Sequence, residues 1–274
     1  MTINCKGQLI DLSQPKVMGI LNVTPDSFFD GNQDIKDSDI VAKAQNMLHD
    51  GADFIDVGGY STRPNANFVS EEEELERVIR AVKLLTKHFP ELIISVDTFR
   101  SHVAEQAILH GASIINDISA GLLDNNMLFV AAKYQVPYIM MHMKGTPQTM
   151  TQHTDYQDII KEMMYYFSER VAVARSVGIN DIILDVGFGF AKTIPQNFEI
   201  LNQLEHFSWL ELPLLVGVSR KSMIYKTLNI TPQEALNGTT VLHTIAIQKG
   251  ASILRVHDVK EAVQSIKLIN SLKS

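Results

Sequence analysis

Short apolar runs alternate with longer amphipathic stretches along almost the whole chain. The runs are rich in Val, Ile and Leu and nearly continuous, which is typical of parallel strands that are buried on both faces. Most of them stop at a polar residue. The pattern predicts strands at Val17–Asn22, Phe54–Val57, Ile93–Asp97, Ile114–Asp117, Pro137–Met141, Asp181–Asp185, Pro213–Gly217 and Ile253–Val256.

Helical periodicity fills the intervals between these runs. Ser70 precedes an acidic run, Glu71–Glu74, with the spacing of a capping box and negative charge in the first turn. The sequences HGAS, KGAS and DGAD place a glycine where a helix ends just before a strand. We expect helices at Val41–His49, from Ser70 onward, and at Ser101–Leu109, Asp158–Ser176 and Glu234–Lys249.

The alternation of strands and helices predicts an α/β fold of the (β/α)8 TIM-barrel class, because eight such units in about 250 residues match that architecture. An open doubly wound sheet is the alternative, but the number of units and the lack of a Gly-rich first turn disfavour it. The residues before Val17 are predicted to form a short N-terminal hairpin across the bottom of the barrel. We expect residues 1–274 to form a single domain.

Composition and charge narrow the class of protein. The chain has 274 residues, of which 45% are hydrophobic and 20% charged, as in soluble globular proteins. A net charge of -7 argues against a nucleic-acid or anionic-membrane surface, and no apolar run is long enough to span a bilayer. The single cysteine, Cys5, cannot form an intrachain disulfide. We therefore expect a cytoplasmic protein with neither a nucleic-acid nor a membrane partner.

Polar residues follow the predicted strands at their carboxyl ends, which gather on one face of a TIM barrel. An Asn or Asp in such a place is commonly a helix cap or a turn former. Polar groups at so many separate strand ends instead indicate a shared site, which we call the mouth. The residues at these strand ends are Asn22, 61–64, Asp97, Asn116, Asp117, Met141, His142, Asp185, 219–221 and 255–258.

The donors and acceptors at the mouth indicate two kinds of ligand group. Two carboxylates, an amide and an ammonium suit the edge of a flat heterocycle, and these are Asp97, Asn116, Asp185 and Lys221. Arginines and a histidine suit a phosphate or carboxylate, and these are Arg63, Arg220, Arg255 and His257. Asn22 offers an oxygen of the kind that Mg²⁺ accepts beside waters and substrate phosphates.

Eight ordered segments, spread over nearly the whole chain, resemble the bacterial-type dihydropteroate synthase family, whose members are pterin-binding barrels. They are GILNVTPDSFFDG from Gly19, DVGGYSTRP from Asp56, SVDT from Ser95, NDIS from Asn116, MHMKGTPQTM from Met141, LDVGFGFAKT from Leu184, GVSRKS from Gly217 and RVHDV from Arg255. The chain departs from the family pattern at Phe29, Tyr60 and Asn65, where Ser, Glu and Gly are usual.

The resemblance implies a transferase of folate biosynthesis that acts on two small-molecule substrates. The family joins 6-hydroxymethyl-7,8-dihydropterin diphosphate to p-aminobenzoate and releases 7,8-dihydropteroate and diphosphate. It implies a dissociative loss of diphosphate, Mg²⁺ as cofactor, sulfonamide sensitivity and a homodimer formed through the last helices. Ala262, Ile266 and Ile269 supply one apolar stripe there, which faces either a partner or the barrel.

Site roles follow by matching position within these segments. The resemblance implies that Asp97, Lys221, Arg63 and Phe28 are catalytic and that Asp97, Asn116, Asp185, Lys221 and Met140 bind the pterin. Asn22, Arg63, Arg255 and His257 are expected at the diphosphate, with Asn22 also at the metal. Thr62, Pro64, Phe190 and Ser222 are expected to form the p-aminobenzoate pocket, which Phe28 helps to close.

Other readings of these signals remain open. A pterin-binding methyltransferase domain of the corrinoid-linked kind shares the barrel and some pterin ligands but needs no diphosphate site. A catalytically silent pterin-binding module is the second alternative. The segment GFGFAKT is no phosphate loop, because Val186 and Ala191 stand where that motif requires glycine. His142, between two methionines, is expected to be wall rather than base.

Overall fold

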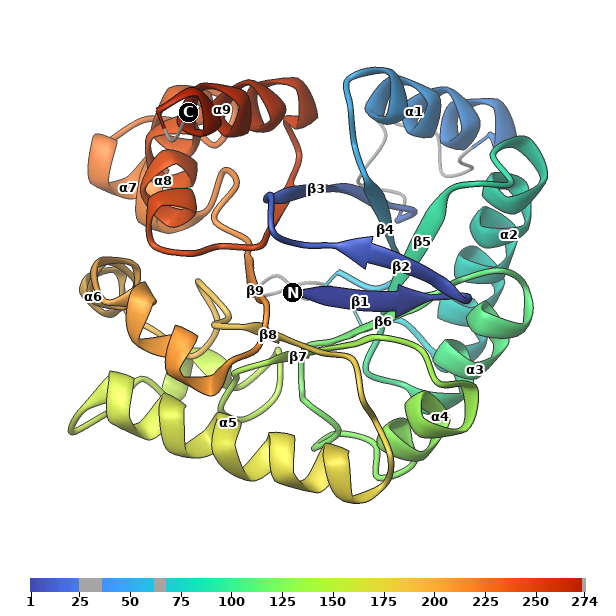
Figure 1. Ribbon diagram of the computed structural model, residues 1–274, viewed down its shortest axis with the longest axis horizontal. Helices are drawn as coiled ribbons and strands as arrows, with labels where there is room; N and C mark the ends of the chain where they lie inside the picture. The colour runs from blue at the N-terminus through green and yellow to red at the C-terminus, as the bar shows by residue number, and fades with distance from the viewer. Residues whose placement is uncertain (25–35, 62–67, 273–274) are drawn as a thin grey trace.

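The computed structural model describes residues 1–24, 36–61 and 68–272, and its parallel strands close into a barrel (Figure 1). Neighbouring strands follow chain order, and the last strand pairs with both the first and the one before it. The predicted (β/α)8 barrel is therefore confirmed. Its strands are β3 (Lys16–Asn22), β4 (Phe54–Gly58), β5 (Ile93–Asp97), β6 (Ile114–Asp117), β7 (Tyr138–Met141), β8 (Ile182–Asp185), β9 (Leu214–Val216) and β10 (Ile253–Val256).

Helices surround the barrel and alternate with its strands (Figure 1). They are α1 (Asp37–His49), α2 (Glu71–His88), α3 (Ser101–Leu109), α4 (Met127–Tyr134), α5 (Ile159–Ser176), α6 (Ile194–Asn202), α7 (Ser222–Leu228), α8 (Leu236–Gln248) and α9 (Val259–Ser271). Short 3₁₀ turns lie at η2 (Met150–Gln152) and η3 (Leu204–Leu210). The predicted cap is present, because the Ser70 side chain accepts a hydrogen bond from the Glu73 amide.

The helix predictions were incomplete at the short helices. No range was predicted for α4, α6, α7 or α9. The first three have 8, 9 and 7 residues, which give too few turns for a clear 3.6-residue period. One local signal was present at α6, where Thr193 and Gln196 form a capping box with a proline in the first turn. The glycine stops are confirmed by Gly111, whose φ of +125° favours glycine.

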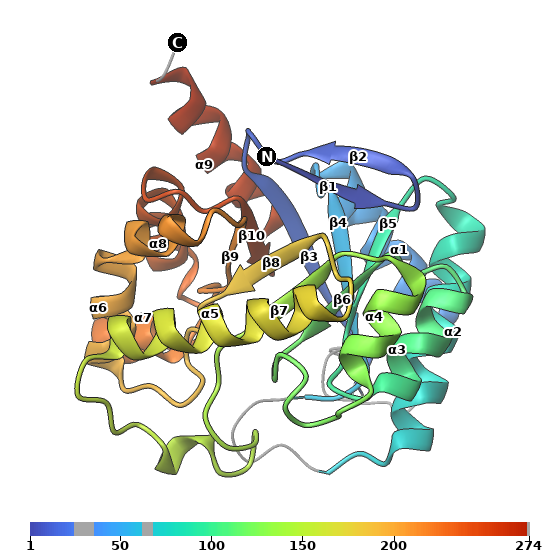
Figure 2. The same cartoon turned by 60° about the horizontal axis from the view of Figure 1, so that its bottom comes forward.

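The N-terminal hairpin lies across one end of the barrel, as Figures 1 and 2 show. Its strands β1 (Thr2–Cys5) and β2 (Gln8–Asp11) pair antiparallel. Ile3, Cys5 and Leu12 are buried against the lowest inward-facing layer of the barrel, so the hairpin closes its bottom. That layer consists of Met18, Phe54, Ile114, Ile139, Ile183, Leu215 and Ile253.

Alternation along each strand separates an outer core from the barrel interior. Outward positions such as Val57 and Leu184 join the continuous core beneath the helices. Inward positions are apolar at the bottom and polar two residues further on, where Asp56 follows Phe54 and Asn116 follows Ile114. The change from apolar to polar along the interior defines the floor of the mouth.

The apolar stripe of the last helix faces the barrel. Ala262, Ile266 and Ile269 are buried in the outer core, so of the two alternatives that the sequence left open, the stripe packs against the barrel. Helix α9 has to cover β10 and β3, and its most apolar side does so. The exposed large apolar residues here are Leu268 on α9 and Leu272, which directly follows the helix.

Candidate active site

The ends of β3, β4 and β5 meet at a glycine. Gly58 pairs with Asn22 on one side and with Asp97 on the other. A Cβ atom at Gly58 would lie 3.2 Å from Asn22 Oδ1 and 3.6 Å from Asp97 Cβ. The missing side chain therefore leaves space between two predicted site residues that the barrel brings together.

Arg255 connects two carboxylates across the interior of the barrel. Its Nε donates to Asp56 Oδ2 and its Nη2 donates to Asp97 Oδ2, each at 2.6 Å. Asn116 Nδ2 donates to the same Asp56 oxygen at 2.9 Å. Asp56 is fully buried and had no predicted role, although it lies within one of the family segments. The signal that points to it is a carboxylate at an inward position of an otherwise apolar strand.

The same contacts set the protonation behaviour of Asp97. Burial raises the pKa of its carboxyl to about 7; the Arg255 guanidinium opposes the rise and the Asp56 carboxylate adds to it. Burial therefore disfavours the ionised form of Asp97, and the Arg255 guanidinium favours it. A carboxylate of this kind can accept hydrogen bonds from a ligand and stabilise a positive charge on it.

Asp185, at the end of β8, and Lys221, which follows β9, interact electrostatically in the mouth. Asp185 Oδ1 accepts from the Gly187 amide at 2.8 Å, and Lys221 Nζ donates to the carbonyl of Phe188. Burial raises the pKa of Asp185, and Lys221 opposes the rise. Burial lowers the pKa of Lys221 to about 8, and Asp185 opposes that change. Each group thus favours the charged form of the other.

A second inward glycine joins the two halves of the site. A Cβ atom at Gly217 would lie 3.9 Å from both Arg255 Cβ and Lys221 Nζ. The Phe190 ring, which is half-buried, has its centroid 5.0 Å from Lys221 Nζ. The mouth therefore combines three carboxylates, two cations, two side-chain amides and an aromatic face around Gly58 and Gly217. This set can hold a flat polar heterocycle and an anion together.

The remaining predicted site residues fall into two groups. His257 is exposed directly after β10, and its amide donates to Ser219 Oγ at 3.1 Å, while Ser222 is the first residue of α7 next to Lys221. These positions place both at strand ends, and their roles stay predictions. Phe28, Thr62, Arg63 and Pro64 lie outside the described residues, as do Phe29 and Asn65.

The predicted contact between Met140 and the pterin face is wrong. Met140 is fully buried in the outer core, and its register partner Leu184 lies there too. Met141 pairs with Asp185 and belongs to a smaller cluster with Phe190 beside it. Because side chains alternate along a strand, a shift of one residue moves a side chain to the opposite face.

Arg220 is not available as an anion ligand. Its Nε and Nη2 donate to the two carboxylate oxygens of Asp258 at 2.8 Å, and its Nη1 donates to the carbonyls of Pro232 and Gln233. This arginine ties loops together instead. His142 is a packing residue, as expected, because it is buried and its ring packs edge-on against Tyr166. Burial lowers the pKa of its imidazole well below the usual value.

Tyr60, one of the departures from the family pattern, joins two segments beside the mouth. It is buried at the end of the β4 segment, and its hydroxyl accepts from Gln148 Nε2 at 2.7 Å. Its ring packs edge-on against Phe99 and lies 5.4 Å from the Arg100 guanidinium. The edge-on ring contact with Phe99 is one that a glutamate in the same place would not make.

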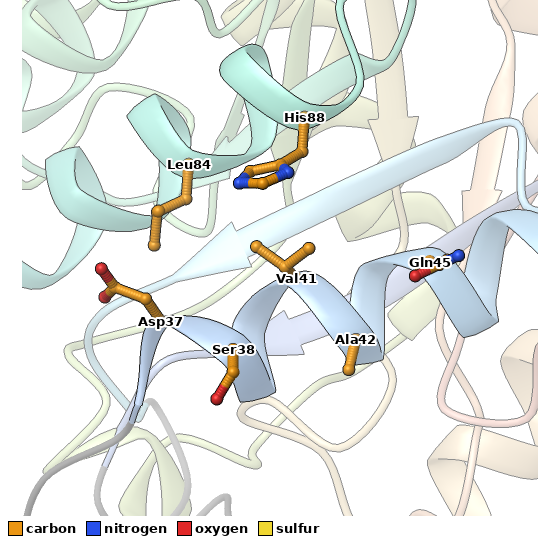
Figure 3. Close-up of a pocket in the computed structure, with 7 residues that line it drawn as sticks. All are labelled: Asp37, Ser38, Val41, Ala42, Gln45, Leu84 and His88. Carbon is orange, nitrogen blue, oxygen red and sulfur yellow. The ribbon is translucent and has the colours of Figure 1, made fainter.

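A groove of about 300 Å³ between α1 and α2 offers no comparable chemistry (Figure 3). Its one carboxylate, Asp37, already pairs with Arg80 at 2.6 Å. The groove contains no strand end and no cluster of inward-facing charges, so the mouth remains the candidate site. The lining residues are Asp37, Ser38, Val41, Ala42, Gln45, Leu84 and His88.

Residues 1–24, 36–61 and 68–272 contain neither a cluster of metal ligands nor a membrane-spanning helix. Within these ranges no three or more His, Cys, Asp or Glu side chains are grouped to hold a metal. Magnesium often binds through one or two protein oxygens together with waters and substrate phosphates, so the prediction for Asn22 is unaffected. No helix in the same ranges has the length and apolarity needed to cross a membrane.

Comparison with known proteins identifies the family. Residues 18–257 match the family described as pterin binding enzyme. The chain is 45% identical to dihydropteroate synthase of Escherichia coli K12 over 276 aligned residues, which cover 100% of this chain and 97% of the relative. The resemblance inferred from the sequence segments is therefore confirmed.

Solved structures agree in fold over the full length. Yersinia pestis dihydropteroate synthase, in a sulfonamide drug complex, superposes with a TM-score of 0.93 at 41% identity and covers 100% of this chain and 99% of its own. The Xanthomonas albilineans enzyme with 4-aminobenzoic acid gives a TM-score of 0.93 at 36% identity, with 100% and 98% covered. The chain belongs to the pterin-binding enzymes and, within them, to the dihydropteroate synthases.

Proposed function

We propose that this chain condenses 6-hydroxymethyl-7,8-dihydropterin diphosphate with p-aminobenzoate to give 7,8-dihydropteroate and diphosphate, a step of folate biosynthesis. The observation that carries the proposal is the Arg255 network with Asp56 and Asp97, together with Asp185 and Lys221. Family membership supports it, and so does a structure of the Xanthomonas albilineans enzyme in complex with 7,8-dihydropteroate.

The pterin edge is assigned to the buried polar residues at the floor of the mouth. Asp97 and Asp185 accept from ring and amino N–H groups, while Lys221 donates to the ring carbonyl and nitrogen. Asn116 donates to Asp56 through its amide nitrogen and so can present its carbonyl oxygen to the ligand. Met141 replaces Met140 as the methionine proposed to lie near the pterin face.

The diphosphate is assigned to Asn22, Arg255 and His257, with Arg63 as a further cation from outside the described residues. Asn22 fits a metal that keeps most of its ligands on waters and phosphates, because it supplies one neutral oxygen next to Gly58, which has no side chain. Bound Mg²⁺ would neutralise charge on the leaving diphosphate. The Arg255 guanidinium and the His257 side chain are proposed to supply N–H donors on the same side.

The reaction requires charge stabilisation rather than a protein nucleophile. The bond between the exocyclic methylene carbon and the diphosphate oxygen breaks, and the bonding electrons leave with diphosphate. The positive charge that remains spreads into the pterin ring, where ionised Asp97 stabilises it. The amine of p-aminobenzoate attacks the methylene carbon and then loses a proton, so a carbon–nitrogen bond replaces the carbon–oxygen bond.

The p-aminobenzoate pocket is assigned to Phe190 and Ser222 together with Thr62 and Pro64, and Phe28 is proposed to exclude water from the cation. Of these residues, Phe190 and Ser222 lie next to Lys221. This placement puts the aromatic amine beside the proposed pterin site, as attack on the methylene carbon requires.

We propose that residues 1–274 work as one domain in a cytoplasmic homodimer, a location in keeping with one buried thiol, Cys5. Because the Ala262 stripe faces the barrel, the proposed dimer surface moves to the outer sides of α8 and α9, where Val241 and Leu268 are 51% and 71% exposed. Sedimentation at micromolar concentration tests this surface, and a monomer would contradict it.

Diphosphate release by the purified protein tests the proposed function. Release from the pterin substrate should depend on p-aminobenzoate and should match dihydropteroate formation one to one. No release, or release that ignores the amine, would overturn the proposal. A pterin-binding methyltransferase domain would give no diphosphate at all, so the same assay separates the two activities.

A further inference from the structure

The turn that follows β8 contacts both charged groups on one side of the mouth. The Gly187 amide donates to Asp185, and the Phe188 carbonyl accepts from Lys221. Phe190, at the end of the same turn, presents its ring near the Lys221 ammonium. The shape of this turn therefore determines where three proposed substrate contacts lie.

A buried lysine holds this turn from behind. Lys192 is 8% exposed, and its Nζ donates to the carbonyls of Phe190 at 2.9 Å, Gly187 at 3.0 Å and His142 at 3.2 Å. An ammonium has three N–H donors, so these three acceptors satisfy it. The contacts join both ends of the turn to each other and to the end of β7.

The backbone around Lys192 is tightly constrained. Gly187 has φ of +67°, and a Cβ atom there would lie 2.3 Å from the His142 carbonyl oxygen. Ala191 also has positive φ, at +49°, and its carbonyl accepts from Tyr156 Oη at 2.9 Å. Three carbonyl oxygens that converge inside the protein repel one another, so they require a cation or several N–H donors between them.

We propose that Lys192 is a positioning residue of the condensation reaction, which fixes the 187–190 turn so that Phe190 meets the aromatic amine. This inference rests on the proposed function and extends it. Lys192 acts through the turn and contacts neither substrate. It also accounts for the lysine in the segment GFGFAKT, which the failed match to a phosphate loop left without a role.

Lys192→Met tests the proposal, because methionine keeps most of the volume and removes all three donors. A displacement of the turn should raise the KM for p-aminobenzoate by about tenfold, with a smaller change in the KM for the pterin. Lys144→Met is the matched control. Lys144 is an electrostatic neighbour of Lys192, but its side chain is 36% exposed and its ammonium pairs with Glu162 at 2.9 Å. Its replacement should therefore change neither the KM for p-aminobenzoate nor that for the pterin.

A double-mutant cycle with Phe190→Ala separates positioning from general support of the fold. If Lys192 acts through Phe190, its replacement should have little further effect on the p-aminobenzoate KM once the ring is gone. Independent effects that multiply, or an unchanged KM in folded Lys192→Met, would overturn the proposal. If Lys192→Met does not fold, Lys192→Gln is tested, because glutamine keeps a neutral N–H donor. Its KM for p-aminobenzoate should rise by an intermediate amount, and an unchanged KM would overturn the proposal.

Wild-type turnover keeps this test distinct from that of the proposed function. Condensation by the wild type together with a normal p-aminobenzoate KM in the Lys192 variants rejects the positioning role alone. Absence of condensation in the wild type rejects the proposed function, and the positioning role falls with it.

Discussion

Replacing Lys221 with alanine should remove both a cationic donor and a titrating group from the pterin site. The lysine stands beside the Phe190 ring, and its ammonium donates to the Phe188 carbonyl. Burial lowers its pKa to about 8. Hydrogen bonds to charged groups contribute about 1.5–3 kcal/mol, so kcat/KM for the pterin at pH 7 should fall about 10- to 100-fold.

The dependence on pH gives a sharper signature than the loss of activity. Below pH 8 the Lys221 ammonium is charged, and above it the free amine predominates. The kcat/KM for the pterin reports groups of the free enzyme, so in the wild type it should fall about tenfold per pH unit on the alkaline side. In Lys221→Ala this alkaline decline should disappear. In Lys221→Arg it should also disappear, because arginine stays charged.

The assay is diphosphate release at saturating p-aminobenzoate from pH 6 to about pH 10, with binding of the pterin measured by calorimetry. Lys226→Ala, an exposed position on the same helix α7, is the control and should keep the wild-type profile. An alkaline decline that persists in folded Lys221→Ala would assign it to another group. Near-normal kcat/KM in that variant would remove Lys221 from the site.

Three further predictions concern the rest of the mouth. Asp56→Asn removes a charge that raises the Asp97 pKa, so the decline of kcat/KM on the acid side should move to lower pH. The variant also loses a buried charged partner of Arg255, which should lower the free energy of unfolding in urea by about 3 kcal/mol. An acid decline at the wild-type pH would contradict the network. Met141→Ala should weaken pterin binding measured by calorimetry. Met140→Ala should leave pterin binding unchanged but lower the free energy of unfolding by about 3 kcal/mol, because its side chain lies in the outer core. The reverse pattern would mean that the two faces of β7 are misassigned. Sulfonamides should compete with p-aminobenzoate and not with the pterin, and diphosphate with Mg²⁺ should tighten their binding; equal affinity with and without diphosphate would rule out the ordered-binding idea.

Local sequence determined the elements and their order. Strands of continuous Val, Ile and Leu were readable because a strand buried on both faces tolerates few other residues. The predicted bounds of β5, β6 and β10 equal the observed ones. The placement of Asp97, Asn116 and Asp185 at strand ends followed from the same signals, since a parallel barrel gathers those ends on one face.

Some site features depended on which face of a strand a side chain occupies. Met140 and Met141 are chemically identical neighbours, and only the register of β7 against β8 decides which one faces the interior. In the same way, the stripe on α9 was readable as apolar, but what it packs against was not. An apolar pattern states that a face is buried and does not name its partner.

Pairing of distant charges was the part that only the tertiary structure decided. Asp56 and Arg255 are 199 residues apart, yet closure of the barrel places them 2.6 Å from each other. Arg220 carries the same charge as Arg255 and also follows a strand, but its contacts turn it to Asp258. The chain thus encodes which groups reach the mouth through short-range periodicity. Closure of the barrel decides which of these charged groups form ion pairs, because an ion pair depends on a distance in space that no local sequence pattern contains.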